Sequence, residues 1–152
     1  MIEFIEIVLL LLSKGVTTFR LDAVAFIWKK NGTSCVNLPE THEIVKLLRL
    51  IVNYINPHAL IVTETNLPRK ENLSYFGNND EANWIYNFPL PPLILYTFLF
   101  EDSSKISGWS KSMPPAQINN AYLNFIASHD GIGMRPAAVS YTHLTLPTTI
   151  EV

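Results

Sequence analysis

Hydrophobic positions along this chain fall into long helical segments that alternate with short strand segments. Residues 2–13 are apolar almost throughout and stop at Lys14 and Gly15, a cation followed by a residue common at helix ends, so a helix is predicted there. Residues 16–21 are short and rich in β-branched and aromatic side chains, which is typical of a buried parallel strand. The first segment of the chain is therefore predicted to be a helix followed by a strand.

The same order repeats in the next segment. Apolar residues recur at helical spacing from about Thr41 onward, and this pattern stops before Pro57. Residues 59–63 then form a second short apolar run with strand character. Helices that alternate with buried strands predict an α/β fold built on a parallel sheet.

The pattern is weaker between the second strand and the third. Residues 66–80 are predicted to be a long loop, and residues 101–120 are polar and irregular. Between them, residues 81–100 are apolar but interrupted by prolines as far as Pro92, so a helix is expected only from about Leu93. Residues 122–126 are the third strand candidate.

Each of the three strand candidates leads into a carboxylate: Asp22, Glu64 and Asp130. In a (β/α)₈ barrel the active site is assembled at the carboxyl ends of the strands. An acid at such a position can instead cap the next helix. Three acids at equivalent positions, with Arg20 before the first and His129 before the last, favour a catalytic site.

Paired carboxyl groups suit the cleavage of a glycosidic bond. One carboxyl protonates the departing oxygen while the other faces the anomeric carbon, and in a retaining enzyme it attacks that carbon. Arg20 lies two residues before Asp22 and therefore points to the same side of the strand. Its positive charge is expected to favour the ionised, nucleophilic form of Asp22.

Composition excludes several classes of protein. Hydrophobic residues are 48% of the chain and charged residues 16%, which indicates a globular fold, and the net charge of -2 argues against nucleic-acid binding. Cys35 is the only cysteine, so neither a disulfide nor a cysteine-based zinc site is expected, and a reducing compartment fits best. No apolar run approaches the ~20 residues of a membrane span. A soluble, cytoplasmic protein without metal or cofactor is predicted.

Three motifs resemble a known family in order and spacing. FRLDAV at 19–24, TETN at 63–66 and SHD at 128–130 are similar to conserved regions of the alpha-amylase superfamily, glycoside hydrolase family thirteen. The resemblance implies a (β/α)₈ TIM barrel, with Asp22 as nucleophile, Glu64 as general acid/base and Asp130 as the third carboxylate. It further implies that Arg20 and His129 are their partners, and Phe26 is expected to contact substrate.

Longer stretches resemble the sucrose-phosphorylase subgroup, which includes glucosylglycerate phosphorylases. Ala25 and Phe26 replace the Lys-His pair common in starch-cleaving members, and Arg69 stands where the subgroup suggests His. The resemblance implies a phosphorylase that converts a small α-glucoside and inorganic phosphate into α-glucose 1-phosphate. A hydrolase or transglucosylase of the same superfamily is the first alternative, and an inactive sugar-binding relic is the second.

The predicted strands are too few for a closed barrel. Residues 1–138 are expected to cover roughly strands four to seven with their helices, and residues 139–152 resemble a translated sequencing adapter. Such a fragment is expected to be poorly soluble and inactive alone, because its sheet is left open.

His42, at the start of a predicted helix, is interpreted as a capping or packing residue or, alternatively, as a ligand.

Overall fold

A four-stranded parallel sheet forms the centre of the fold. The computed structural model describes residues 2–132, and its strands lie in the order β1-β2-β3-β4. Their bounds are Thr18–Leu21 for β1, Leu60–Thr63 for β2, Trp84–Tyr86 for β3 and Ala121–Leu123 for β4. Each strand pairs with the next one along the chain in parallel. This sheet and its helices confirm the predicted α/β class and fit a segment of a barrel.

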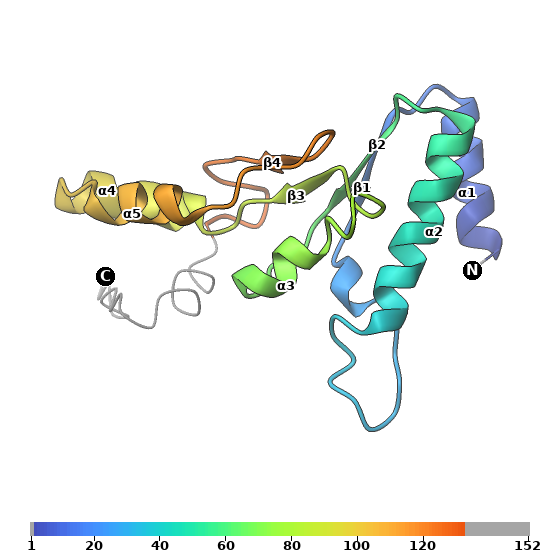
Figure 1. The fold of residues 1–152 in the computed structure, drawn as a ribbon, viewed down its shortest axis with the longest axis horizontal. Helices are drawn as coiled ribbons and strands as arrows, with labels where there is room; N and C mark the ends of the chain where they lie inside the picture. The colour runs from blue at the N-terminus through green and yellow to red at the C-terminus, as the bar shows by residue number, and fades with distance from the viewer. Residues whose placement is uncertain (1, 133–152) are drawn as a thin grey trace.

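Helices connect the strands. Their bounds are Ile2–Ser13 for α1, Pro39–Ile55 for α2, Arg69–Ser74 for α3, Leu90–Phe100 for α4 and Ser104–Ser112 for α5, with a short 3₁₀ turn η1 at Val24–Phe26. Figure 1 shows α1 and α2 side by side at one end of the molecule, and α4 and α5 together at the other end. The sheet joins these two helical pairs.

The hydrophobic core lies between the sheet and the pair α1 and α2. Phe19 and Leu21 are buried while their neighbours Thr18 and Arg20 are exposed, so β1 presents alternate side chains to two different faces. The apolar side chains of β1 and β2 pack against Val8 and Leu12 of α1 and the buried face of α2. The opposite face of β1 is left to Arg20 and, beyond the strand, Asp22.

Several predictions about the middle of the chain were wrong. Residues 66–80 contain α3, and residues 101–120 contain α5. Strand β3 lies within 81–100 and was missed, and α4 begins at Leu90. Pro91 and Pro92 occupy the first turn of α4, where backbone N–H groups need no helical partner, so these prolines start the helix instead of delaying it.

The remaining predictions about elements have clear outcomes. The helix over 2–13 and the strand near 59–63 are confirmed, and the third strand candidate is present but ends at Leu123. The proposed foreign tail, residues 139–152, lies outside the described residues. No helix within residues 2–132 is both long enough and apolar enough to cross a membrane.

Candidate active site

Asp22 and Glu64 lie next to each other at the carboxyl edge of the sheet. Leu21 pairs with Thr63 in the register of β1 and β2, and each acid follows directly on its strand. The backbone N–H of Glu64 donates to the carbonyl of Leu21 at 3.0 Å, which continues the parallel ladder to this point. The sheet thus brings the first two predicted catalytic acids to neighbouring strand ends.

Arg20 links Asp22 to the third strand. Its Nη1 donates to Asp22 Oδ1 at 2.5 Å, and its Nε donates to the hydroxyl of Tyr86 at 3.0 Å. Partial burial disfavours the charged guanidinium, but the bonds to Tyr86 and Asp22 outweigh that effect and raise the pKa of Arg20. A permanent positive charge therefore lies against the carboxylate of Asp22.

The side chain of Glu64 is bound to the turn that follows Asp22. Its Oε2 accepts a hydrogen bond from the backbone N–H of Ala23 at 2.8 Å. Ala23 has a φ of 44° and is the N-cap residue directly before the 3₁₀ turn η1, so the chain bends sharply straight after Asp22 and exposes this N–H. The position of the Glu64 carboxyl thus depends on the backbone conformation of the neighbouring loop.

An aromatic cluster lies beside Arg20. The rings of Tyr86, Phe88 and Phe125 lie 5.4 Å apart, centroid to centroid, in each of their three pairings, and the Arg20 guanidinium is 5.5 Å from the Tyr86 ring centroid. The sequence interpretation overlooked these residues. The alternation of Trp84, Tyr86 and Phe88 at a period of two was an available strand signal.

Asp130 and His129 are not brought into contact with the first two acids. Both lie beyond β4, in a tight turn where Ser128 and Gly131 form reciprocal backbone hydrogen bonds. His129 Nε2 is 3.3 Å from Asp130 Oδ2, and both side chains are at least 70% exposed. Among the described residues, hydrogen bonds thus join Arg20 to Asp22 and Glu64 to the turn after Asp22, and none joins Asp130 or His129 to them.

Phe26 lies in η1 with a half-exposed ring. Lys29 Nζ is 5.3 Å from the ring centroid, which is cation–π distance. The ring thus stands next to a cation on its own loop.

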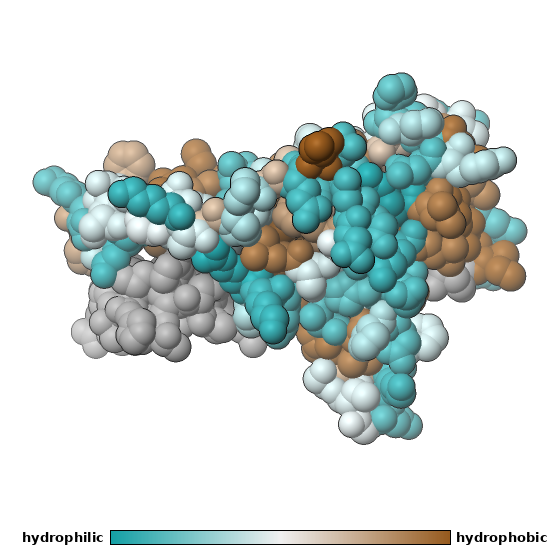
Figure 2. Space-filling model, viewed as in Figure 1, coloured by the Kyte–Doolittle hydropathy of each residue, from teal (hydrophilic) through white to brown (hydrophobic). Residues whose placement is uncertain are grey.

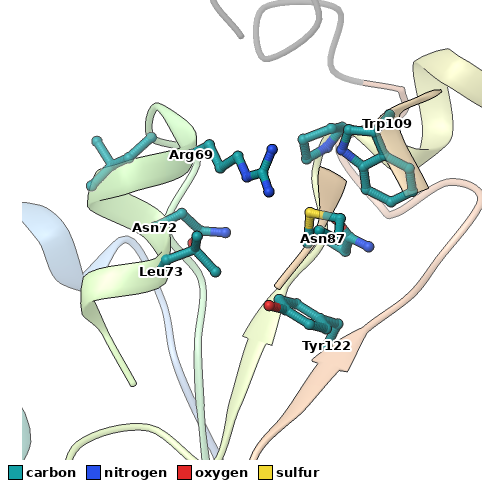
Figure 3. A pocket seen from close by; sticks show the side chains of 9 residues that line it. Arg69, Asn72, Leu73, Asn87, Trp109 and Tyr122 are labelled. Carbon is teal, nitrogen blue, oxygen red and sulfur yellow. The ribbon is translucent and has the colours of Figure 1, made fainter. Parts of the chain in front are cut away.

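A pocket opens beside the site, between α3, α5 and the strands β3 and β4. Figure 3 shows Arg69 from α3 facing Trp109 from α5, with Asn87 and Tyr122 below them. Arg69 donates to the side-chain oxygen of Ser112 at 2.9 Å and also to the Ser112 carbonyl. The guanidinium that replaces the expected His therefore connects α3 to the end of α5 at the pocket wall.

Metal ligands do not gather in the described part of the chain. Within residues 2–132, no group of three or more His, Cys, Asp or Glu side chains is arranged to hold an ion. The chemistry available at the site is that of a carboxylate held by an arginine beside a second carboxyl group. Such a pair can supply a nucleophile and a proton donor.

Comparisons with known proteins agree with the motifs. Residues 2–133 match the family model described as the alpha amylase catalytic domain. Glucosylglycerate phosphorylase from Allomeiothermus silvanus is 50% identical over 90% of this chain, and the Spirochaeta thermophila enzyme of that name is 48% identical over 90%. Trehalose synthase from Thermus thermophilus is 38% identical over 76% of the chain.

These relatives are much longer than this chain. The matched segment makes up 25% of the A. silvanus relative, 23% of the S. thermophila relative and 12% of the trehalose synthase. The family match nevertheless covers all of the described residues. The chain belongs to the alpha-amylase catalytic domain family.

Proposed function

We propose that this chain forms the central part of the catalytic barrel of a retaining α-glucoside phosphorylase. The observation that carries the proposal is the Arg20–Asp22 ion pair beside Glu64, at the carboxyl ends of adjacent parallel strands. Four strands cannot close a barrel, so the activity is assigned to a complete enzyme, meaning residues 2–132 together with the rest of the barrel.

The proposed reaction has two displacements at the anomeric carbon. An Asp22 oxygen attacks that carbon while Glu64 transfers a proton to the departing glycosidic oxygen, which leaves as an alcohol. A phosphate oxygen then attacks the glucosyl ester of Asp22 and gives its proton to Glu64. The Asp22 carboxylate is regenerated, and two inversions yield α-glucose 1-phosphate.

The other predicted site residues take supporting roles in this proposal. Asp130 is assigned as the third carboxylate, which grips the sugar hydroxyls, and His129 as its partner. Arg20 and Phe26 are assigned to the glucosyl-binding surface. For Asp130 and His129 this requires their exposed turn to lie over the sugar when substrate is bound.

Glucosylglycerate is the leading substrate candidate, because two relatives of that name are 50% and 48% identical to this chain. Sucrose and sucrose 6-phosphate are the other candidates. A cytoplasmic location belongs to the same proposal, and its support is the single cysteine.

A transglucosylase or hydrolase is the second candidate function. The trehalose synthase of T. thermophilus, 38% identical to this chain, supports a sugar as the acceptor. The covalent step is the same in both cases, so the choice depends on whether phosphate, a sugar or water attacks the ester. An inactive sugar-binding relic is disfavoured, because binding alone requires no proton donor at Glu64.

Phosphate dependence is the direct test. The complete enzyme is incubated with glucosylglycerate, sucrose or sucrose 6-phosphate, with and without inorganic phosphate, and glucose 1-phosphate and free glucose are measured. We expect glucose 1-phosphate to form only when phosphate is present. Equal glucose release with and without phosphate would contradict the phosphorylase and favour the hydrolase.

Replacing the nucleophile tests the assignment of Asp22. The variant Asp22→Asn of the complete enzyme should still bind substrate but lose at least about 10³-fold in kcat, because an amide cannot form the glucosyl ester. The matched control is Glu6→Gln on the exposed side of α1, which should retain full activity. Substantial turnover by Asp22→Asn would refute the assignment.

A further inference from the structure

The loop between β1 and α2 is held in an unusual backbone conformation. Ala23, Cys35 and Asn37 have φ values of 44°, 54° and 52°, in the left-handed region that non-glycine residues rarely adopt. This conformation is strained for Ala23 and Cys35 and easier for Asn37, so contacts elsewhere must hold this loop in place. One of these contacts is the backbone N–H of Asn37, which donates to the carbonyl of Ala25 in η1 at 2.8 Å.

The side chain of Asn37 connects this loop to a histidine on α2. His42 Nε2 lies 3.2 Å from Asn37 Oδ1, and His42 Nδ1 lies 2.7 Å from Glu81 Oε2. The imidazole also lies against the buried ring of Tyr75, with 4.6 Å between the ring centroids and 30° between the planes. Contacts at both nitrogens and on one ring face leave His42 a single orientation.

Glu81 is a rigid anchor for this histidine. The residue is only 3% exposed, and its carboxyl group packs against Gly77 so closely that a Cβ there would lie 2.9 Å from Glu81 Oε1. The buried side chain of Arg49 donates to the Glu81 carbonyl at 3.3 Å. A buried carboxyl group in water-excluded surroundings needs a hydrogen-bonding partner, and His42 provides it.

These contacts form a continuous path from the buried turn to the catalytic acids. Glu81 fixes His42, His42 fixes Asn37, and the Asn37 N–H fixes the carbonyl of Ala25. Ala25 belongs to η1, and the N–H of its N-cap residue Ala23 binds the Glu64 carboxyl. A shift of the loop at Asn37 therefore moves the hydrogen-bond donor that orients Glu64.

We propose that His42 and Glu81 are positioning residues for glucosyl transfer, which hold the turn after Asp22 so that Ala23 orients the proton donor Glu64. This inference rests on the proposed function of Asp22 and Glu64. Neither His42 nor Glu81 touches these acids, so both act through Asn37 and η1. His42 is therefore assigned to positioning, and not to the binding of a ligand.

The test uses substrates that differ in their need for a proton donor. Glucosylglycerate requires protonation of its departing oxygen, whereas α-glucosyl fluoride releases fluoride with little need for it. In the complete enzyme, His42→Ala should lower kcat for glucosylglycerate at least about 10-fold, with KM changed less than about threefold. Release of fluoride from α-glucosyl fluoride in the first turnover, before phosphate gives its proton to Glu64, should slow less than about threefold.

Two further variants separate positioning from loss of the fold. Asn37→Gly keeps the left-handed backbone and its N–H but removes the contact with His42, without changing the core, and should show the same selective loss. Glu81→Gln keeps a hydrogen-bonding oxygen and should retain more activity than Glu81→Ala. The matched control is Val45→Ala, a fully buried neighbour on α2, which should destabilise the protein without favouring either substrate.

Two outcomes overturn the inference. The first is equal loss with both substrates in His42→Ala and Asn37→Gly. The second is wild-type rates in Asn37→Gly.

If the wild-type enzyme transfers no glucosyl group at all, the proposed function fails separately. The positioning link is then decided by amide hydrogen exchange, which should become faster at Ala23 and Asn37 in the His42→Ala variant and remain unchanged if the link is wrong.

Discussion

Arg20 makes two contacts that serve different purposes. The bond from Nη1 to Asp22 places a positive charge against the negative charge of the carboxylate. The bond from Nε to the Tyr86 hydroxyl fixes the plane of the guanidinium. The Tyr86 ring also lies within cation–π distance of the same group. Tyr86 thus controls how Arg20 is presented to Asp22, although its own side chain originates two strands away.

Removing the Tyr86 hydroxyl tests this control. Tyr86→Phe keeps the ring but removes the acceptor of the Arg20 Nε–H, and a hydrogen bond of this kind contributes about 0.5–1.5 kcal/mol. We expect kcat of the complete enzyme to fall roughly 3–10-fold, measured under saturating substrate. The control is Tyr54→Phe, at an 86% exposed position of α2, which should change nothing. An unchanged kcat in Tyr86→Phe would show that Arg20 needs no such support.

The fully buried Tyr75 and the partly buried Tyr122 should respond differently to loss of their hydroxyl group. The Tyr75 hydroxyl has no hydrogen-bond partner among the described residues, and burial raises its pKa, whereas the Tyr122 hydroxyl donates to the Pro114 carbonyl at 2.9 Å. Tyr75→Phe should leave stability unchanged or raise it by about 1 kcal/mol, while Tyr122→Phe should lower it by about 1 kcal/mol. Urea unfolding of both variants measures the difference, and equal shifts would contradict it.

Local sequence signals were sufficient for part of the site. Asp22 and Glu64 were predicted because each directly follows a short apolar run, and Arg20 because it shares a strand face with Asp22. Tyr86 could not be found in this way, since its bond to Arg20 joins residues 66 positions apart. The His42–Glu81 contact, across 39 positions, was missed for the same reason.

At the scale of elements, predictability followed length and regularity. Helix α2 has 17 residues with a clear apolar stripe, and its existence was predicted. Strand β3 has three residues and is followed by prolines, so its short pattern was outweighed by the turn signals around it. Helix α5 has mostly polar residues and buries only Trp109, which gives too little periodicity to recognise a helix.

Gly77 and Gly108 should respond oppositely to the same substitution. Gly77 has a φ of 56°, and an added Cβ would overlap Asp80 Oδ1, so Gly77→Ala must distort the turn that anchors Glu81. Gly108 lies within α5 with open space around it, so Gly108→Ala should stabilise that helix by about 0.5–1 kcal/mol. Thermal unfolding should show a lower midpoint for Gly77→Ala and an equal or higher one for Gly108→Ala. A tolerated Gly77→Ala would mean that this turn can relax.

At the scale of the whole molecule, the sheet is open at both sides. Strands β1 and β4 each pair with one neighbour only among the described residues. Large apolar side chains are also exposed on α1 and α2, including Ile7 at 54% and Leu50 at 68%. Figure 2 shows apolar surface at the end of the molecule where these helices lie. In a closed barrel such surface is covered by neighbouring units.

The 152-residue chain alone is therefore expected to self-associate and to lack phosphorolysis. Open strand edges and apolar helix faces promote association, and charge placed on those faces opposes it. The double variant Ile7→Glu/Leu50→Glu should lower the weight-average mass in light scattering toward the 17.2 kDa of the monomer. The control Ser107→Glu/Ser110→Glu adds the same two charges to exposed polar positions of α5 and should leave the association unchanged.

A wild-type chain that is monomeric at high concentration would show that these surfaces do not promote association. Equal dissociation in both double variants would show that net charge, rather than the apolar faces of α1 and α2, governs association.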